Sequence, residues 1–391
     1  MNKTIFSQIM DHASRYQFDY LVKKYQGNKK SHKFSCWDHF LCMSFAQLTY
    51  RNSLRDIEIC LKAQPKKLLS MGIIGNPTRT NIANANQTRN WRIYADHAQK
   101  LISQAKKLYQ DDQPFSVELE NTVYALDAST IDLCLTLFPW AKFRKTKSAI
   151  KLHTLLDIRG SIPSYIEITD GSVHDVNILD ELILEPGSYY LMDRAYIDFA
   201  RLYKINTELC FFVTRAKKNL NFCRVYSAQL DRQSGLICDQ IIKLTLAKSA
   251  NEYPDRLRRI KYYDKETEKT LVFLTNNFEV PPLIIAELYK NRWKIELFFK
   301  WIKQHLKIKS FLGTTSNAVK SQIWIAISTY VIIAIIKKRL NIKISLYSML
   351  QIFSLTLFEK IPFHDLFFGE EVKPTLTPTE NRQLDFSDFI D

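Results

Sequence analysis

Val123-Tyr-Ala-Leu-Asp127 is a short apolar run that ends in an acid, and it opens the stretch that decides the fold of this 391-residue chain. Four more apolar runs of strand length follow it, at 151–158, 164–169, 189–192 and 210–214. Between the last three runs, residues 175–184 and 197–206 have the spacing expected of helices. The predicted order is therefore three strands, helix, strand, helix, strand.

This order predicts an α/β fold. The first three strands can form an antiparallel meander, with Arg159-Gly-Ser-Ile-Pro163 as the turn between the second and the third. The later strands can join in parallel through helical crossovers. A mixed sheet with helices in this order is the arrangement of the ribonuclease-H-like fold.

The rest of the chain divides into segments of different pattern. Residues 1–112 are typical of helices, and a polar connector at 110–121 separates them from the strands. We expect a helical N-terminal domain at 1–112 and the first part of the core at 118–215. A β-rich insertion at 216–275 should follow, and then the second part of the core at 276–340, with a long helix at 282–306. Residues 341–391 should form C-terminal helices and an acidic tail.

The composition indicates a folded and strongly basic protein. The chain has 46% hydrophobic and 24% charged residues, which excludes disorder as its main state. It has 55 Lys and Arg against 40 Asp and Glu, a net charge of +15. This charge suggests a polyanionic partner, although a Lys-rich bias would give the same value and charge alone does not distinguish DNA, RNA and a membrane surface.

Three features bear on the compartment. The most apolar stretch, 323–336, is shorter than the roughly 20 residues that a bilayer requires, so we expect a buried core helix and no membrane association. Residues 1–16 have no continuous apolar segment of the kind found in signal peptides. The seven Cys are odd in number and form no Cys-x-x-Cys pair, which favours reduced thiols in a cytosol over a disulfide framework or a zinc knuckle.

A polar helix is predicted after Pro77, running to about Trp91. It would display Arg79, Asn86 and Arg89, and it follows a turn and a short helix in the manner of a helix-turn-helix. Arg, Asn and Gln side chains can contact base edges through two hydrogen bonds. This helix therefore predicts that residues 1–112 form a DNA-binding domain. A plain solvated helix face is the alternative.

Asp127 and Asp193 each follow an apolar strand, which is where α/β sheets present functional groups. A turn Asp at a strand end is the alternative for each of them. A row of polar side chains also lies on the long predicted helix, within a sector about 60° wide that borders an apolar stripe. An ordinary surface row of ion pairs would have the same spacing. The row consists of Tyr289, Arg292, Glu296 and Lys303.

This row, Tyr289-x2-Arg292-x3-Glu296-x6-Lys303, resembles the Y-R-E-K signature of bacterial insertion-sequence transposases of family four, a branch of the DDE superfamily. Residues 125–130 and 190–196 look like the two strands that carry the first and second Asp of that family. Residues 80–91 resemble part of the helical domain that precedes the catalytic core in one subgroup. The resemblance covers nearly the whole chain apart from the tail.

The resemblance implies that Asp127, Asp193 and Glu296 are catalytic carboxylates that bind Mg²⁺ or Mn²⁺. Strand transfer replaces one phosphodiester oxygen by another, and two metal ions about 3.5–4 Å apart can activate the nucleophile and neutralise the leaving oxygen. Carboxylates are the hard oxygen ligands that Mg²⁺ prefers. The remaining residues of the row would contact DNA phosphates: Tyr289, Arg292 and Lys303. A basic loop could contact the DNA backbone nearby, or could simply be solvated: Lys142, Arg144 and Lys145.

The family implies a DNA transposase that binds the terminal inverted repeats of its own element, cleaves the ends and joins the 3′-hydroxyl groups to target DNA. It would act as a dimer in the synaptic complex, in a bacterial cytoplasm at the nucleoid. Two alternatives stay open: a ribonuclease-H-like Mg²⁺-dependent nuclease that only hydrolyses, and an inactive DNA-binding regulator. Some relatives stack a flipped base on a Trp of the insertion. The insertion of this chain contains no Trp, and its aromatic alternatives are Tyr226, Tyr262 and Tyr263.

Overall fold

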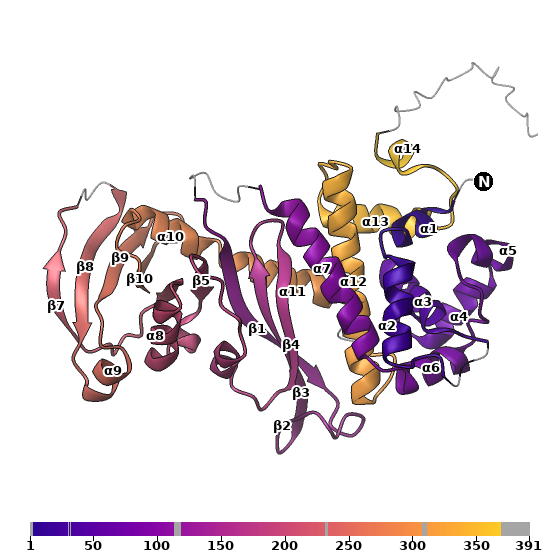
Figure 1. The fold of residues 1–391 in the computed structure, drawn as a ribbon, viewed down its shortest axis with the longest axis horizontal. Helices are drawn as coiled ribbons and strands as arrows, with labels where there is room; N and C mark the ends of the chain where they lie inside the picture. The colour runs from indigo at the N-terminus through magenta and orange to yellow at the C-terminus, as the bar shows by residue number, and fades with distance from the viewer. Residues whose placement is uncertain are drawn as a thin grey trace, which may run out of the picture.

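The computed structural model describes residues 3–29, 31, 33–112, 119–230, 234–306 and 311–368. The molecule is elongated, with a helical bundle at one end, a mixed sheet in the middle and antiparallel strands at the other end (Figure 1).

The N-terminal region is helical, as the sequence predicts. Ser53 caps the fourth helix, because its side chain accepts a hydrogen bond from the amide of Asp56 at 3.1 Å. Ser35 and Asp38 form a capping box at the start of the third. The helices are α1 (Ile5–Met10), α2 (Arg15–Lys24), α3 (Cys36–Leu48), α4 (Leu54–Lys62), α5 (Pro65–Leu68), η1 (Leu69–Met71), α6 (Arg79–Thr88) and α7 (Arg92–Tyr109).

The ten described strands form one continuous mixed sheet. Strands β1 (Val123–Leu133), β3 (Lys147–Asp157) and β4 (Ile162–Asp170) are antiparallel neighbours. On the other side of β1, strands β5 (Tyr189–Met192) and β6 (Phe211–Arg215) follow in parallel. The short β2 (Lys142–Arg144) pairs with the start of β3. The predicted ribonuclease-H-like α/β core is confirmed.

Alternate residues of β1 and β5 face two different cores. The even-numbered residues, such as Tyr124 and Leu126, pack in a cluster with η2 (Asp175–Asp180) and α8 (Phe199–Thr207). The odd-numbered residues, such as Val123 and Ala125, join the larger core that contains α7 and α12 (Ser316–Arg339). The next odd positions after Ala125 and Leu191 are 127 and 193, and this alternation directs both toward the larger core.

The segment predicted as a β-rich insertion extends the core sheet. Its elements are β7 (Phe222–Ser227), β8 (Leu236–Leu244), α9 (Ala247–Glu252), β9 (Leu257–Asp264) and β10 (Lys269–Thr275). Strand β10 lies antiparallel to β6, with Phe273 opposite Arg215. The hydrogen bonds of the sheet thus continue from the core into this segment.

Two predicted helices differ from what the structure shows. The long helix at 282–306 is two helices, α10 (Pro282–Lys290) and α11 (Trp293–His305). The break falls at Asn291, whose backbone N–H and side-chain amide both donate to the carbonyl of Glu287, at 3.2 and 2.9 Å. The helix predicted at 175–184 is the short 3₁₀ segment η2.

Helix α12 is the centre of the larger core. It is long and apolar enough to cross a membrane by length and composition, but it is almost entirely buried inside the protein. It lies beside α7, between the sheet and the N-terminal helices (Figure 1). Helices α13 (Leu346–Thr356) and α14 (Phe363–Phe368) follow it, and the predicted acidic tail at 369–391 lies outside the described residues.

Candidate active site

Asp127 and Asp193 lie side by side at the end of a parallel strand pair. The pairing of β1 with β5 ends with Leu126 opposite Met192, and each Asp is the next residue in this register. Neighbouring strands lie about 4.8 Å apart, and both acids occupy odd positions, on the side of the larger core. One expectation was wrong: β1 does not end at Asp127 but continues to Leu133, because this part of the strand stays paired with β3.

Arg292 connects Asp127 to Glu296. Its Nη1 donates a hydrogen bond to Oδ2 of Asp127 at 3.1 Å, and its Nη2 donates to Oε1 of Glu296. Arg292 stands at the break between α10 and α11, and Glu296 lies one turn further along α11. Two carboxylates from distant parts of the sequence therefore share one guanidinium.

Partial burial shapes the electrostatics of this group. The side chain of Arg292 is 15% exposed and that of Asp127 is 24% exposed, whereas that of Glu296 is 57% exposed. Burial raises the pKa of the Asp127 carboxyl, and the negative charge of Glu296 raises it further; the amide of Ala128 and the charge of Arg292 oppose this shift. A partly buried carboxylate with a second one nearby favours a cation between them, and Arg292 supplies that cation.

A divalent ion would need the position that Arg292 takes between the two carboxylates. Among the described residues, no group of three or more His, Cys, Asp or Glu side chains is gathered closely enough to hold a metal ion. Asp127 and Asp193 nevertheless offer adjacent hard oxygen donors, which suit Mg²⁺. The residues fit such an ion if Arg292 turns away from Asp127 and Glu296.

Tyr289 and Lys303 lie on either side of this group. The ring centre of Tyr289 is 5.9 Å from Cζ of Arg292, and burial raises the pKa of the Tyr289 hydroxyl to about 12. Lys303 donates a hydrogen bond from Nζ to the carbonyl of Thr130 at 2.7 Å, on β1 beyond Asp127. Tyr289 packs against Phe273 of β10, with ring centres 5.1 Å apart, whereas α11 lies against β1. The predicted row of four residues thus extends from β10 to β1 along α10 and α11.

Our sequence reasoning missed a second polar cluster beside the two Asp residues. Tyr196 is buried, and its hydroxyl has no hydrogen-bond partner in the described part of the chain. Burial, and then the charges of Asp127 and Asp175, raise its pKa. Asp175 pairs with Lys151 at 2.9 Å and lies 4.0 Å from Nδ1 of His153. The sequence signal that could have revealed this cluster is the spacing of Lys151 and His153, which places both side chains on one face of the strand next to Asp127.

The predicted basic loop is the exposed hairpin between β2 and β3, and the structure does not bring it to the acids. Lys142, Arg144 and Lys145 are all exposed there. Asp127 pairs with Thr154, seven residues along β3 from Lys147. At roughly 3.4 Å per residue this separates the hairpin from Asp127 by about 24 Å along the strand.

The structure also changes the expectation for α6. Arg79 is exposed at its first turn, but Asn86 and Arg89 are only 1% and 7% exposed. Asn86 accepts a hydrogen bond from Nε2 of His39 at 2.9 Å. Arg89 donates to the carbonyls of Gly27 and Phe34 in the loop before α3. Direct DNA contact by Arg89 does not fit this position, because the guanidinium already holds that loop.

The fold and the paired acids define the class of the protein as α/β with a ribonuclease-H-like core. The chain belongs to the transposase DDE domain family, whose model matches residues 118–332, more than half of the sequence. Residues 1–74 match a second family, described as a domain of unknown function (DUF4372). The predicted resemblance to insertion-sequence transposases is thereby confirmed.

Two relatives that match by sequence support the same family. Transposase y4zB of Sinorhizobium fredii is 32% identical over 68% of this chain and 73% of its own length. The transposase for insertion sequence element IS5377 of Geobacillus stearothermophilus is 27% identical over 61% of this chain and 64% of its own. Among solved structures, the piggyBac transposase synaptic complex with hairpin DNA matches with a TM-score of 0.44 and 11% identity, over 95% of this chain and 80% of that one.

Proposed function

We propose that the protein is a DNA transposase that binds the terminal inverted repeats of an insertion sequence, cleaves the element ends and transfers the 3′-hydroxyl ends to target DNA. The observation that carries this proposal is the adjacency of Asp127 and Asp193 in the register of β1 and β5. Glu296 is connected to Asp127 through the guanidinium of Arg292, which donates a hydrogen bond to each of them. Family membership supports the chemistry, because DNA cleavage and joining are the work of transposases.

In this proposal Asp127, Asp193 and Glu296 hold divalent metal ions, Mg²⁺ or Mn²⁺. When bound there, such ions would supply the charge that activates the attacking oxygen and stabilises the leaving one. Arg292 releases the two carboxylates and binds a phosphate near the reacting bond through two parallel hydrogen bonds. Tyr289 and Lys303 contact the same stretch of backbone from either side. The exposed hairpin residues Lys142, Arg144 and Lys145, with Arg79, contact DNA further away.

The proposal also includes the assembly and the place of action. Two copies bring the two element ends together in a synaptic complex, in the bacterial cytoplasm at the nucleoid. The mass of the complex that forms on end DNA, measured by light scattering, tests the expected dimer.

The decisive experiment measures nicking and joining on labelled duplexes from the DNA that flanks the gene. Wild-type protein with Mg²⁺ should nick the end and join it to a target plasmid. Asp127→Asn, Asp193→Asn and Glu296→Gln should each abolish both steps and keep DNA binding. Asp132→Asn is the matched control, since Asp132 is exposed on the same strand and its even position faces away from Asp127.

The same assay separates the alternatives. Nicking without joining would indicate a nuclease, and end binding without nicking would indicate a regulator. Loss of nicking in Asp132→Asn as well would contradict the assignment of the three acids.

A further inference from the structure

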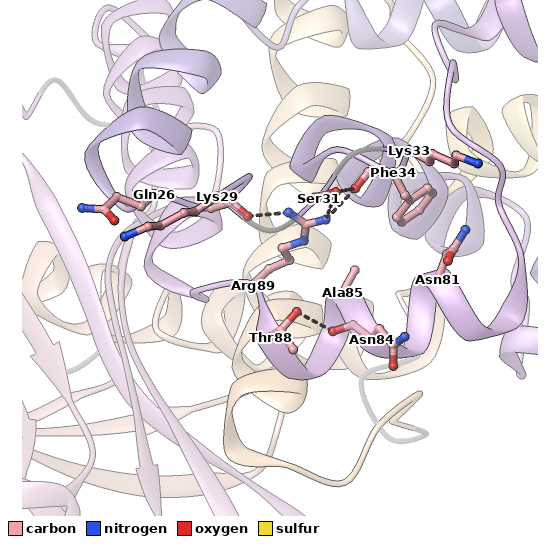
Figure 2. Close-up of a pocket in the computed structure, with 11 residues that line it drawn as sticks. Gln26, Lys29, Ser31, Lys33, Phe34, Asn81, Asn84, Ala85, Thr88 and Arg89 are labelled. Carbon is pink, nitrogen blue, oxygen red and sulfur yellow. Dashed lines mark hydrogen bonds between the residues drawn. The ribbon is translucent and has the colours of Figure 1, made fainter.

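A polar groove lies among the N-terminal helices, in a part of the sequence that precedes Asp127, Asp193 and Glu296. It has a volume of about 390 Å³ and runs between α6 and the described residues that precede α3, which are Gln26, Gly27, Lys29, Ser31, Lys33 and Phe34 (Figure 2). Asn81, Asn84 and Thr88 line it from α6, and Lys29 and Lys33 line it from the loop. None of the described residues that line it is Asp or Glu. We call it the α6 groove.

The free face of α6 borders this groove. Thr80, Asn84 and Gln87 are exposed, and their spacing of four and three residues places them on one face of the helix. The opposite face is buried through Ile82, Ala85 and Asn86. An exposed row of one hydroxyl and two amide side chains beside a cationic groove is suited to a partner with both acidic groups and hydrogen-bonding edges.

A buried cation lies beneath the groove. Arg89 lines it, is 7% exposed, and donates to the Ser31 hydroxyl at 2.7 Å and the Phe34 carbonyl at 2.5 Å. The partners that the described residues give it are neutral, and its Nε has none among them. Because these contacts satisfy hydrogen bonds without cancelling the charge, an anion in the groove would be attracted.

Helix α6 is held firmly in this position. Asn317 of α12 donates from Nδ2 to the carbonyls of Asn86 and Arg89, at 2.9 and 2.6 Å. His39 fixes the Asn86 side chain from below. The groove and the exposed face are therefore parts of a preformed surface, which lowers the cost of ordering on binding.

The positive charge of the N-terminal region favours a nucleic acid as the partner of the α6 groove. Residues 1–112 contain 18 Lys and Arg against 8 Asp and Glu, a net +10 of the +15 of the whole chain. DNA presents phosphates at a regular spacing and adenine edges that Asn and Gln contact through two hydrogen bonds.

We infer that the α6 groove and the exposed face of α6 form the surface that recognises the DNA of the element ends. Lys29 and Lys33 bind backbone phosphate at the groove, and Asn84 and Gln87 contact base edges. This inference rests on the proposed function, and it replaces Asn86 and Arg89 as the base-contacting residues of this helix.

The test uses the full chain and two DNA probes: duplexes from the DNA on either side of the gene, and scrambled duplexes of the same composition. Asn84→Ala with Gln87→Ala should reduce the preference for end DNA by about tenfold or more, with little change on scrambled DNA. Lys29→Gln with Lys33→Gln should weaken binding to both probes and lower the salt dependence by about two ions. Lys23→Gln with Lys100→Gln is the matched control, because both lysines are exposed outside the groove.

Two results would overturn the inference in different ways. If the wild-type protein does not prefer end DNA, the proposed function fails and the inference fails with it. If the wild type prefers end DNA and the Asn84/Gln87 variant keeps that preference with an unchanged unfolding temperature, only the inference fails.

Discussion

Arg292 bridges two carboxylates, so we expect its replacement to reduce end cleavage more than DNA binding. We expect Arg292→Ala to reduce end cleavage by roughly 10²-fold, the size of effect seen when one preorganised hydrogen-bond donor to a developing negative charge is removed. DNA affinity should fall only a few-fold, since it comes from many distributed basic contacts. Filter binding and nicking on the same preparation measure both. Arg194→Ala, an exposed neighbour of Asp193, is the control. Equal losses in both assays would make Arg292 a general DNA contact.

Asp127 should weaken the fold near neutral pH. Burial raises the pKa of its carboxyl above the unfolded value, so the folded state favours the protonated form and loses relative stability as pH rises through the folded pKa. Asp127→Asn removes this cost and keeps an oxygen that can accept from Arg292. We expect its unfolding temperature at pH 7 to equal or exceed that of the wild type, with the difference vanishing in acid. A lower unfolding temperature at pH 7 would contradict this account.

The same variant tests metal binding without any assay of activity. A ligand that binds only the folded state stabilises it by RT ln(1 + [L]/Kd), or about 2.7 kcal/mol at a hundredfold excess over Kd. Titration with Mg²⁺ should raise the unfolding temperature of the wild-type protein but not that of Asp127→Asn. An equal rise in both proteins would place the ion elsewhere.

At the scale of single residues, the sequence predicts the position of an acid in the fold where that acid follows an apolar run. The positions of Asp127 and Asp193 in the sheet could be predicted because each follows an apolar run, and the parallel pairing of β1 with β5 aligns the two runs. Their catalytic role stays a prediction. The burial of Arg89 could not be predicted, because it depends on a loop some 60 residues earlier whose carbonyls need a donor. The hydrogen bond between Arg292 and Asp127 likewise depends on the docking of α11 against β1.

At the scale of elements, the break between α10 and α11 shows the limit of periodicity. Residues 288–293 contain neither Gly nor Pro, so the helical spacing continues through them without a visible signal. The break arises where Asn291 turns its amide back to the carbonyl of Glu287. The predicted row of polar residues still extends across the sheet, from Phe273 of β10 beside Tyr289 to the carbonyl of Thr130 on β1 beside Lys303, because α10 packs on β6 and α11 packs on β1.

Helices α2, α3 and α7 enclose His97, which should make the helical bundle sensitive to acid. Its ring centre lies 5.1 Å from that of Phe18 and 5.2 Å from that of Phe40. Burial lowers its pKa to about 4, below the unfolded value. The unfolded chain therefore binds the proton more readily, and stability present above pH 6.5 is lost as the pH falls toward 4. This amounts to about 2 kcal/mol at pH 5.

Replacing the imidazole should remove this part of the pH dependence. We expect His97→Leu to show a smaller drop in unfolding temperature between pH 7 and pH 5 than the wild type. The remaining drop includes that of His39, whose pKa is also lowered to about 4 by burial. His174→Leu, at an exposed position, should keep the wild-type dependence. An unchanged pH profile in His97→Leu would show that another group controls acid sensitivity.

At the scale of the whole molecule, elements from both ends of the sequence share one core. Composition shifts suggest separate units, yet β10 continues the core sheet and α12 packs against α7 and α3. The amide of Ile5 donates to the carbonyl of Glu359 at 2.8 Å, and the hydroxyl of Tyr109 donates to the carbonyl of Ala334 at 2.9 Å. Sequence patterns locate elements, but they do not reveal which distant element covers an apolar face.

This sharing predicts that residues 1–112 do not fold fully by themselves. The fragment lacks α12, so the buried apolar residues of α7 would face water, at a cost of about 25 cal/mol per Å² of exposed apolar surface. We expect weak helicity and no cooperative thermal transition for the fragment in circular dichroism. Joining it through a flexible linker to residues 311–368 should restore a sharp transition. A cooperative transition of the fragment alone, at the temperature of the full chain, would show instead that the N-terminal helices form an independent domain.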